Sequence, residues 1–184
     1  MAETPSKMIP LGTKAPDFEL TDVKTGKDIS LQDVRSDIAT VVMFICNHCP
    51  YVKHINEHLV EFANNYIKKG ISFVAISSND VKNYPEDSPE KMTKVAKELG
   101  YPFPYLYDET QEVAKAYDAA CTPDFYIYDK DLKLVYRGQY DESRPGNKKP
   151  VTGSDLGDTL DLLLAGKPVP TDQIPSVGCN IKWK

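Results

Sequence analysis

Two short apolar runs dominate the hydrophobic pattern of the chain. Residues 38–45 are apolar except for Thr40 and are rich in Val and Ile, and residues 71–77 form a second run. Runs of this length and composition are typical of strands buried on both faces of a sheet. Between them, apolar residues recur every three or four positions over 52–69, which predicts an amphipathic helix. A strand, a helix and a strand at this spacing predict a βαβ unit with parallel strands.

Alternating patterns predict a hairpin on each side of this unit. The first pairs residues 17–20 with 29–31 around a Thr-Gly-Lys turn, and the second pairs 121–129 with 133–140 around Lys-Asp. The remaining predicted elements are three helices and one strand: helices over 89–99, 109–117 and 154–165, and a strand over 105–107. Parallel strands first and an antiparallel hairpin last, with helices on both faces, predict a mixed α/β sandwich.

Chain length and net charge limit the number of domains and the kinds of partner. A chain of 184 residues is expected to form a single domain, with a core over about 9–166 and an extended surface tail over 167–184. The net charge of −5 argues against a nucleic-acid partner. No apolar run approaches the ~20 residues of a membrane span, and residues 1–7 do not resemble a secretory signal. A cytoplasmic location is therefore predicted.

The candidate reactive residues are two cysteines at the junction between the first buried run and the predicted helix. Cys46 and Cys49 occupy this junction, and Pro50 can open the helix because the first helical position needs no N–H donor. The partial positive charge of a helix N-terminus favours thiolate over thiol. Four cysteines in a cytosolic chain of this size indicate redox chemistry or metal binding rather than a disulfide scaffold.

The element order, with a cysteine ending the first central strand and Thr122-Pro123 leading into the late hairpin, resembles the thioredoxin fold. Residues 12–20, Gly-Thr-Lys-Ala-Pro-Asp-Phe-Glu-Leu, and the insertion between 78 and 110 resemble the peroxiredoxin-like (AhpC/TSA, redoxin) family. So do the Cys-Asn-His-Cys-Pro-Tyr-Val motif and the Pro-Ser-Val-Gly-Cys-Asn-Ile-Lys-Trp-Lys ending. The resemblance implies a thioredoxin-like three-layer sandwich with an N-terminal hairpin, a mixed sheet and that insertion. It also implies a thiol–disulfide oxidoreductase that needs no cofactor.

The register of the motif decides which thiol is the nucleophile. Thioredoxins place the first active-site cysteine five residues after a strand phenylalanine, and Phe44 plus five is Cys49. Val52 then replaces the second cysteine of the family motif, and Cys46 becomes an extra thiol in the preceding loop. The register that makes Cys46 the first cysteine stays open.

Four further residues gain roles from the resemblance. Thr122-Pro123 matches the cis-proline loop that lies against the active-site sulfur in this fold, so Pro123 is expected to face the substrate. Lys53 is expected to help hold a thiolate, as basic residues do in thioredoxins. By its position before the nucleophile, His48 is expected either to stabilise the thiolate or shuttle a proton, or to be a solvent-exposed loop residue.

Three thiols compete for the role of resolving cysteine. Cys46 is favoured because it is nearest in sequence to Cys49. Cys121 stands two residues before Pro123, which the fold brings to the site. Cys179 lies in the tail, which could swing in. The expected partners are thiols and disulfides of proteins or small molecules; the pattern does not specify an oligomeric state.

Two other functions fit part of the pattern. A thiol peroxidase of this family uses Pro-x-x-x-Thr-x-x-Cys and a distant arginine, but Val42 and Cys46 stand at the Pro and Thr positions, and no arginine is near Thr122 in the sequence. Peroxide is therefore the less favoured substrate. A non-enzymatic redoxin that binds a metal or a partner is the other alternative.

A metal site could recruit His54 and His58 beside the two motif cysteines. The gap between the cysteines and these histidines is shorter than in zinc fingers, and the helix carries both histidines away from the motif. We therefore expect no metal and two solvated histidines.

Overall fold

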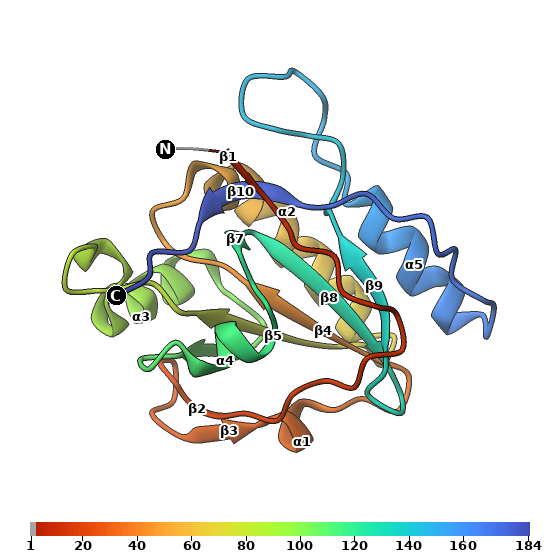
Figure 1. Cartoon of the computed structure of the whole chain (residues 1–184), viewed down its shortest axis with the longest axis horizontal. Coiled ribbons are helices and arrows are strands. Elements are labelled where there is room, and N and C mark those ends of the chain that lie inside the picture. The colour runs from red at the N-terminus through yellow and green to blue at the C-terminus, as the bar shows by residue number, and fades with distance from the viewer. Residues whose placement is uncertain (1–2) are drawn as a thin grey trace.

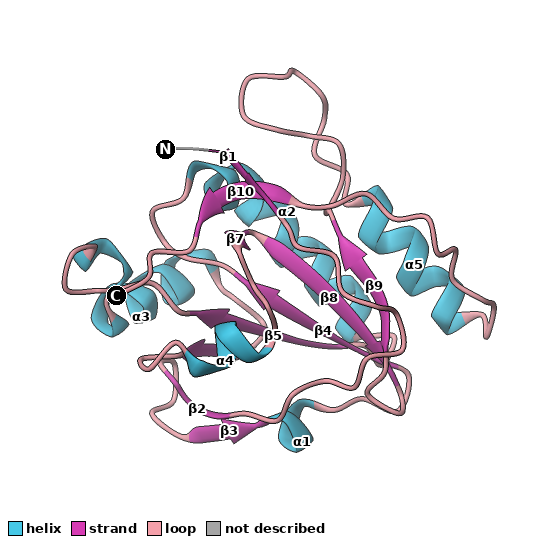
Figure 2. Cartoon of the chain, in the orientation of Figure 1, coloured by secondary structure: helices cyan, strands magenta, loops and turns pink. Residues whose placement is uncertain are grey.

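The computed structural model describes residues 3–184, and in it helices lie on both faces of a central sheet (Figures 1 and 2). The elements follow one another in this order: β1 (Glu3–Pro5), β2 (Glu19–Asp22), β3 (Asp28–Ser30), α1 (Leu31–Val34), β4 (Ala39–Phe44), α2 (Pro50–Ile67), β5 (Ser72–Ser77), a 3₁₀ turn (Pro85–Asp87), α3 (Pro89–Leu99), β6 (Tyr105–Tyr107), α4 (Glu112–Ala116), β7 (Cys121–Thr122), β8 (Asp124–Asp129), β9 (Leu134–Gly138), α5 (Ser154–Leu164) and β10 (Val177–Asn180).

The central sheet of this part of the chain has seven strands in the order β3-β2-β6-β5-β4-β8-β9. β4 and β5 are parallel, as the βαβ pattern predicts, and β8 pairs with β4 in the antiparallel sense. The hairpins β2–β3 and β8–β9 are both present. The predicted mixed α/β sandwich is therefore confirmed, with β4 at its centre.

Alternation along the central strand divides the core into two layers. Val41 and Met43 face one side with α2, α3 and α5, whereas Val42 and Phe44 face the other side with α1 and α4. Every residue of β4 is buried, which explains why the run shows no polar alternation. Among residues 3–184 no helix is long and apolar enough to cross a membrane.

A proline begins one helix and a glycine ends another. Pro50 is the first residue of α2, where its missing N–H leaves no helical bond unmade. Gly100 ends α3 in the left-handed conformation with φ +69°, which glycine adopts without steric cost. Ser88 directly precedes α3, but its side chain makes no capping hydrogen bond.

The C-terminal tail differs from the expectation of a surface segment. β10 is the middle strand of a second sheet, β1-β10-β7, within the described residues. Cys179, Ile181 and Lys182 are buried, so the prediction of a tail on the surface is wrong for this stretch. The strand predicted over 121–129 is also divided, because the chain turns at Pro123 and only the part after it joins the central sheet.

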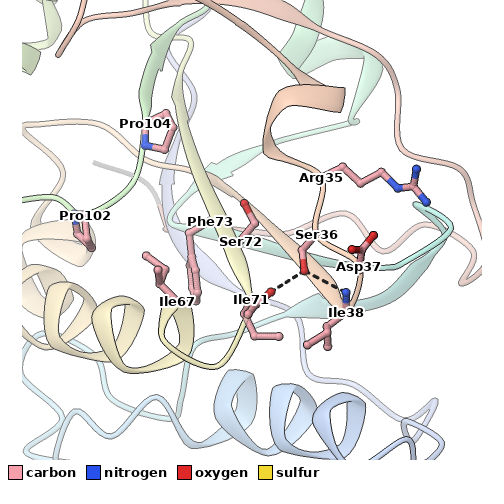
Figure 3. A pocket seen from close by; sticks show the side chains of 11 residues that line it. Arg35, Ser36, Asp37, Ile38, Ile67, Ile71, Ser72, Phe73, Pro102 and Pro104 are labelled. Carbon is pink, nitrogen blue, oxygen red and sulfur yellow. Dashed lines mark hydrogen bonds between the residues drawn. The ribbon is translucent and has the colours of Figure 1, made fainter.

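The largest cleft described lies far from the cysteines. It has a volume of about 560 Å³ and lies at the amino ends of β4 and β5, between Ser36, Ile67 and Pro104 (Figure 3). The Ser36 hydroxyl donates to the Gly70 carbonyl at 2.6 Å and closes one side of it. Because the motif cysteines follow the carboxyl end of β4, this cleft takes no part in their chemistry.

Candidate active site

The topology brings three segments to the carboxyl end of β4. β5 is parallel to β4, so the chain after Ser77 emerges beside the motif. β8 is antiparallel to β4, with Asp124 opposite Phe44, so the residues before Asp124 lie at the same edge. β10 then pairs with these residues, setting Cys179 opposite Thr122. Segments far apart in the sequence therefore meet around Cys49.

Cys49 occupies the position directly before α2. Its backbone is extended (φ −66°, ψ 123°), and its carbonyl accepts the N–H of Lys53 at 3.0 Å as the first bond of the helix. The sulfur therefore lies at the N-terminus of an 18-residue helix, where the helix dipole favours negative charge. The thiol is completely buried.

The Thr122-Pro123 peptide bond is cis, as the resemblance implied. The carbonyl of Thr122 lies 3.3 Å from the Cys49 Sγ and accepts its S–H when the thiol is protonated. The Thr122 hydroxyl lies 3.6 Å from the Cys46 Sγ. The cis-proline loop thus contacts both motif cysteines.

The tail cysteine, Cys179, is in direct contact with Cys49. The Sγ atoms of Cys49 and Cys179 are 2.8 Å apart and hydrogen-bonded. The sequence favoured Cys46 as the partner because of its proximity along the chain, but pairing of β10 with β7 brings Cys179 into direct contact. Cys121 is a buried residue of β7 itself, opposite Asn180, with its Sγ 3.9 Å from the Pro123 carbonyl oxygen.

Hydrogen bonds make Cys49 the acidic thiol of the group. A bond from the Cys46 thiol contributes most to lowering the pKa of Cys49 to about 5, against burial, which raises it. Donors on Cys179 and Thr122 and the Val52 backbone N–H lower it further. A thiol with this pKa is about 99% thiolate at pH 7, compared with about 3% for an ordinary thiol of pKa ~8.5.

The other thiols are shifted in the opposite direction. The pKa of Cys46 lies well above its usual value because it donates to Cys49, is buried and lies near Asp87. Burial and the bond to Cys49 raise the pKa of Cys179 to about 12. Burial also raises the pKa of Cys121. Cys49 is therefore the thiol that carries the negative charge at neutral pH.

We expect Cys46→Ala to raise the pKa of Cys49 by about one unit or more, because it removes the largest stabilising donor. Cys46→Ser keeps a donor and is expected to leave that pKa near 5. Ultraviolet absorbance of the thiolate against pH measures both. Equal pKa values in the two variants would show that the Cys46 donor is unimportant.

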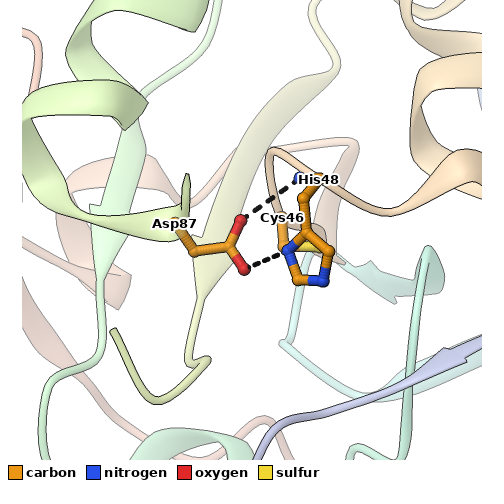
Figure 4. Close-up of side chains that lie close together, drawn as sticks. All are labelled: Cys46, His48 and Asp87. Carbon is orange, nitrogen blue, oxygen red and sulfur yellow. Dashed lines mark hydrogen bonds and ion pairs between the residues drawn. The ribbon is translucent and has the colours of Figure 1, made fainter. Parts of the chain in front are cut away.

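A buried carboxylate braces the loop between the two motif cysteines (Figure 4). One oxygen of Asp87, Oδ1, accepts the backbone N–H groups of Asn47 and His48 at 2.8 and 3.3 Å. The other oxygen, Oδ2, contacts His48 Nδ1 at 2.5 Å and accepts the Asn79 side-chain amide at 2.8 Å. Asp87 is completely buried. The His48 side chain is therefore paired with Asp87 and belongs to this brace, and its role as a proton shuttle remains a prediction.

The same brace is the group of potential metal ligands in the described part of the chain. Donor atoms of Cys46, His48 and Asp87 all lie within 4.8 Å of one another. Both carboxylate oxygens of Asp87 already accept two hydrogen bonds each, and the raised pKa of Cys46 disfavours the thiolate that a metal requires. The arrangement therefore fits a structural brace better than a metal centre.

The remaining candidates lie along α2. His54 Nε2 contacts the Ser143 hydroxyl and His58 Nδ1 the Tyr140 hydroxyl, both at 2.7 Å, so these rings join α2 to the loop after β9. His54 is exposed, as predicted, whereas His58 is half-buried, so the prediction of a solvated histidine is wrong for His58. Lys53 is exposed, and its support of the thiolate remains a prediction.

One arginine lies closer to the cis-proline than the sequence suggested. Arg137 is completely buried on β9, and its guanidinium donates to the Asp124 carboxylate at 2.9 Å, directly after Pro123. No arginine is near Thr122 in the sequence, and only the pairing of β9 with β8 brings Arg137 to this strand. The guanidinium is paired with Asp124 and also donates to the Asp118 carbonyl, so it serves the packing of β8 and β9.

The sequence predicts no role for two residues of the site. Asp87 lies in a polar Pro-Glu-Asp-Ser-Pro turn, which gives no hint that one of its acidic side chains is buried. Gly178 directly precedes Cys179, and a glycine next to a cysteine was the one available sign of a close backbone approach.

A central β4-α2-β5 unit, a cis-proline at the neighbouring strand and a cysteine before α2 define a thioredoxin-type fold. The thioredoxin domain of a thiol-disulfide oxidoreductase from Bacteroides vulgatus shares this fold, with a TM-score of 0.60 at 21% identity over 74% of this chain and 91% of that one. The chain itself belongs to the AhpC/TSA family, whose sequence model matches residues 11–137. Both the predicted family and the predicted fold are confirmed.

Two further relatives extend this result. The crystal structure of an uncharacterized conserved protein from Geobacillus kaustophilus is 67% identical, with a TM-score of 0.98 over 100% of this chain and 97% of that one. The thiol-disulfide oxidoreductase ResA of Geobacillus kaustophilus (strain HTA426) is 28% identical over 137 residues, covering 73% of this chain and 74% of the relative. The C-terminal segment of this chain therefore has a counterpart in at least one solved structure.

Proposed function

We propose that the protein is a thiol–disulfide oxidoreductase in which Cys49 is the nucleophile. The observation that carries the proposal is the acidic thiol at the start of α2, facing a cis-proline loop. Similarity to a thiol-disulfide oxidoreductase supports the same class of reaction. The substrates are then disulfides and thiols of proteins or small molecules, and the predicted cytoplasmic location remains a prediction.

The reaction follows from the charge on Cys49. The thiolate attacks one sulfur of a substrate disulfide, forms a mixed disulfide and releases the other sulfur as a thiolate. A second protein thiol then attacks the Cys49 sulfur and releases the remaining product. An external dithiol returns the oxidised protein to its starting state. Disulfide exchange is favoured over peroxide reduction because a thiol, Cys46, stands where the family's peroxidases carry threonine, and Arg137 is paired with Asp124.

Exposure of the reduced chain to glutathione disulfide tests this assignment. We expect Cys49 to be oxidised before any other cysteine, which is measured by trapping free thiols with iodoacetamide at successive times and mapping the peptides. Cys121 is the internal comparison, because its raised pKa keeps it protonated. If Cys121 or Cys46 is oxidised first while Cys49 remains free, the assignment is wrong.

A further inference from the structure

β10 covers the candidate active site completely. It lies between β1 and β7, with Cys179 opposite Glu3 on one side and Thr122 on the other. Cys49 is 0% exposed and Cys179 is 3% exposed. A disulfide substrate therefore cannot reach Cys49 while β10 is in place, and the strand has to open before the reaction proposed above can start.

The fit of β10 against β7 depends on a glycine. A Cβ atom at Gly178 would lie 1.9 Å from the Thr122 carbonyl oxygen and 2.7 Å from its carbonyl carbon. These are backbone atoms, which cannot rotate away as a side chain can. A glycine directly before Cys179 therefore allows the strand to approach closely enough for the two sulfurs to meet.

Hydrogen bonds before and after β10 hold the strand in one position. Upstream, the Ser6 N–H donates to the Ser176 carbonyl at 2.7 Å and the Ser176 hydroxyl donates to the Pro123 carbonyl at 2.5 Å. Downstream, the Lys182 N–H donates to the Asn79 side chain at 2.9 Å. A strand anchored in this way returns Cys179 to the same position after each opening.

Electrostatics distinguish the two thiols that contact Cys49. The hydrogen bond to Cys49 and the charge of Cys49 raise the pKa of both thiols, but Asp87 also raises the pKa of Cys46, whereas Lys182 lowers the pKa of Cys179. Two of the three causes that raise the pKa of Cys179 are its hydrogen bond to Cys49 and the charge of Cys49. Both causes disappear for Cys46 as well as for Cys179 once Cys49 has formed a mixed disulfide. The remaining difference is that Cys179 lies near the charge of Lys182, whereas Cys46 lies near the carboxylate of Asp87.

We propose that Cys179 is the resolving cysteine and that β10 is a strap that opens to admit the disulfide and closes to release the product. This inference rests on the proposed role of Cys49. The Cys49 thiolate attacks RS–SR′, forms Cys49–S–S–R and releases R′S⁻. The Cys179 thiol loses its proton to solvent, attacks the Cys49 sulfur, forms the Cys49–Cys179 disulfide and releases RS⁻. The protein loses two electrons and the substrate gains two; an external dithiol then reduces the protein.

The resolving step is tested on the native full-length chain by counting the nitrothiobenzoate ions that each protein molecule releases from the aromatic disulfide 5,5′-dithiobis(2-nitrobenzoate). The wild type is expected to release two nitrothiobenzoate ions from the site and to contain a Cys49–Cys179 bond in peptide maps. Cys179→Ser is expected to release one and to retain the other as an adduct on Cys49. Cys121→Ser, the matched loss of a buried thiol, is the control and is expected to release two. Cys46→Ser removes the rival resolving thiol, and a Cys49–Cys179 bond in its peptide map is the expected result.

Gly178→Val separates the two steps of the reaction. A strap that opens in roughly 0.1–10% of molecules limits attack by Cys49, so displacing the strap is expected to accelerate the first release by tenfold or more. The second release should become at least tenfold slower, because Cys179 no longer returns to its position beside Cys49.

Ile174→Ala, on the exposed part of the tail, is the control and should change neither rate. Fluorescence of Trp183, the single tryptophan of the chain, reports whether the tail is packed against β7 in each variant.

The outcomes separate the two proposals. Release of two ions by Cys179→Ser together with release of one by Cys46→Ser would make Cys46 the resolving thiol and overturn this inference, while leaving Cys49 as the nucleophile. Two rates that change in the same direction in Gly178→Val would overturn the strap. Unchanged release by Cys49→Ser would instead overturn the proposed function.

Discussion

Cys49→Ser is expected to reduce the rate of attack on glutathione disulfide by a factor of about 100 or more, to the background of the remaining thiols. The substitution removes the one site thiol whose pKa is lowered, to about 5, and leaves thiols whose pKa values are raised. A serine hydroxyl does not ionise in the same range. The measurement is release of glutathione in a single turnover of reduced, full-length protein.

The pH dependence of the wild-type reaction gives an independent check. Because the thiolate is the attacking form, the rate is expected to fall about tenfold per pH unit below pH 5 and to be nearly flat from pH 6 to 8. Opening of the strap scales all rates equally and leaves the midpoint in place. Cys121→Ser is the matched control, with an expected change of less than about twofold. A midpoint near pH 8.5, or a Cys49→Ser variant that retains half of the rate, would contradict the assignment.

Asp87→Ala is expected to lower the free energy of unfolding by about 3–5 kcal/mol. The carboxylate is completely buried and contacts four donor groups, two on the backbone of the motif loop and two on side chains. Alanine leaves these donors without their acceptor in a site that water does not reach. Urea denaturation of the reduced protein, followed by far-ultraviolet circular dichroism, measures the change.

Glu86→Ala provides the matched control for this prediction. Glu86 is the adjacent acidic residue in the same turn, but it is exposed, so the expected change is within about 0.5 kcal/mol. Asp87→Asn keeps the size of the side chain and is expected to fall between the two. Equal stabilities of Asp87→Ala and Glu86→Ala would show that the brace contributes nothing to folding.

The central features of the fold were accessible from local patterns. The buried run before the motif became β4, and the 3.6-residue periodicity after it became α2, with Pro50 at the first helical position. Each of these features depends on residues within a few positions of one another, so a periodicity or a helix-start residue is enough to predict it. Counting from Phe44 to Cys49 likewise led to the cysteine at the helix N-terminus, because that register involves only neighbouring residues.

The surroundings of Cys49 depend on contacts between distant segments. The sequence favoured Cys46 as partner and placed the tail on the surface, whereas strand pairing brings Cys179, 130 residues away, into contact with Cys49. The buried brace of Asp87 comes from the insertion before α3, 40 residues from the loop that it holds. Short-range patterns carry no information about which edge of a sheet a later segment will join. The local register thus pointed to the acidic thiol, Cys49, whereas the thiol that contacts it was set by tertiary packing, because pairing between distant strands brings Cys179 to the site.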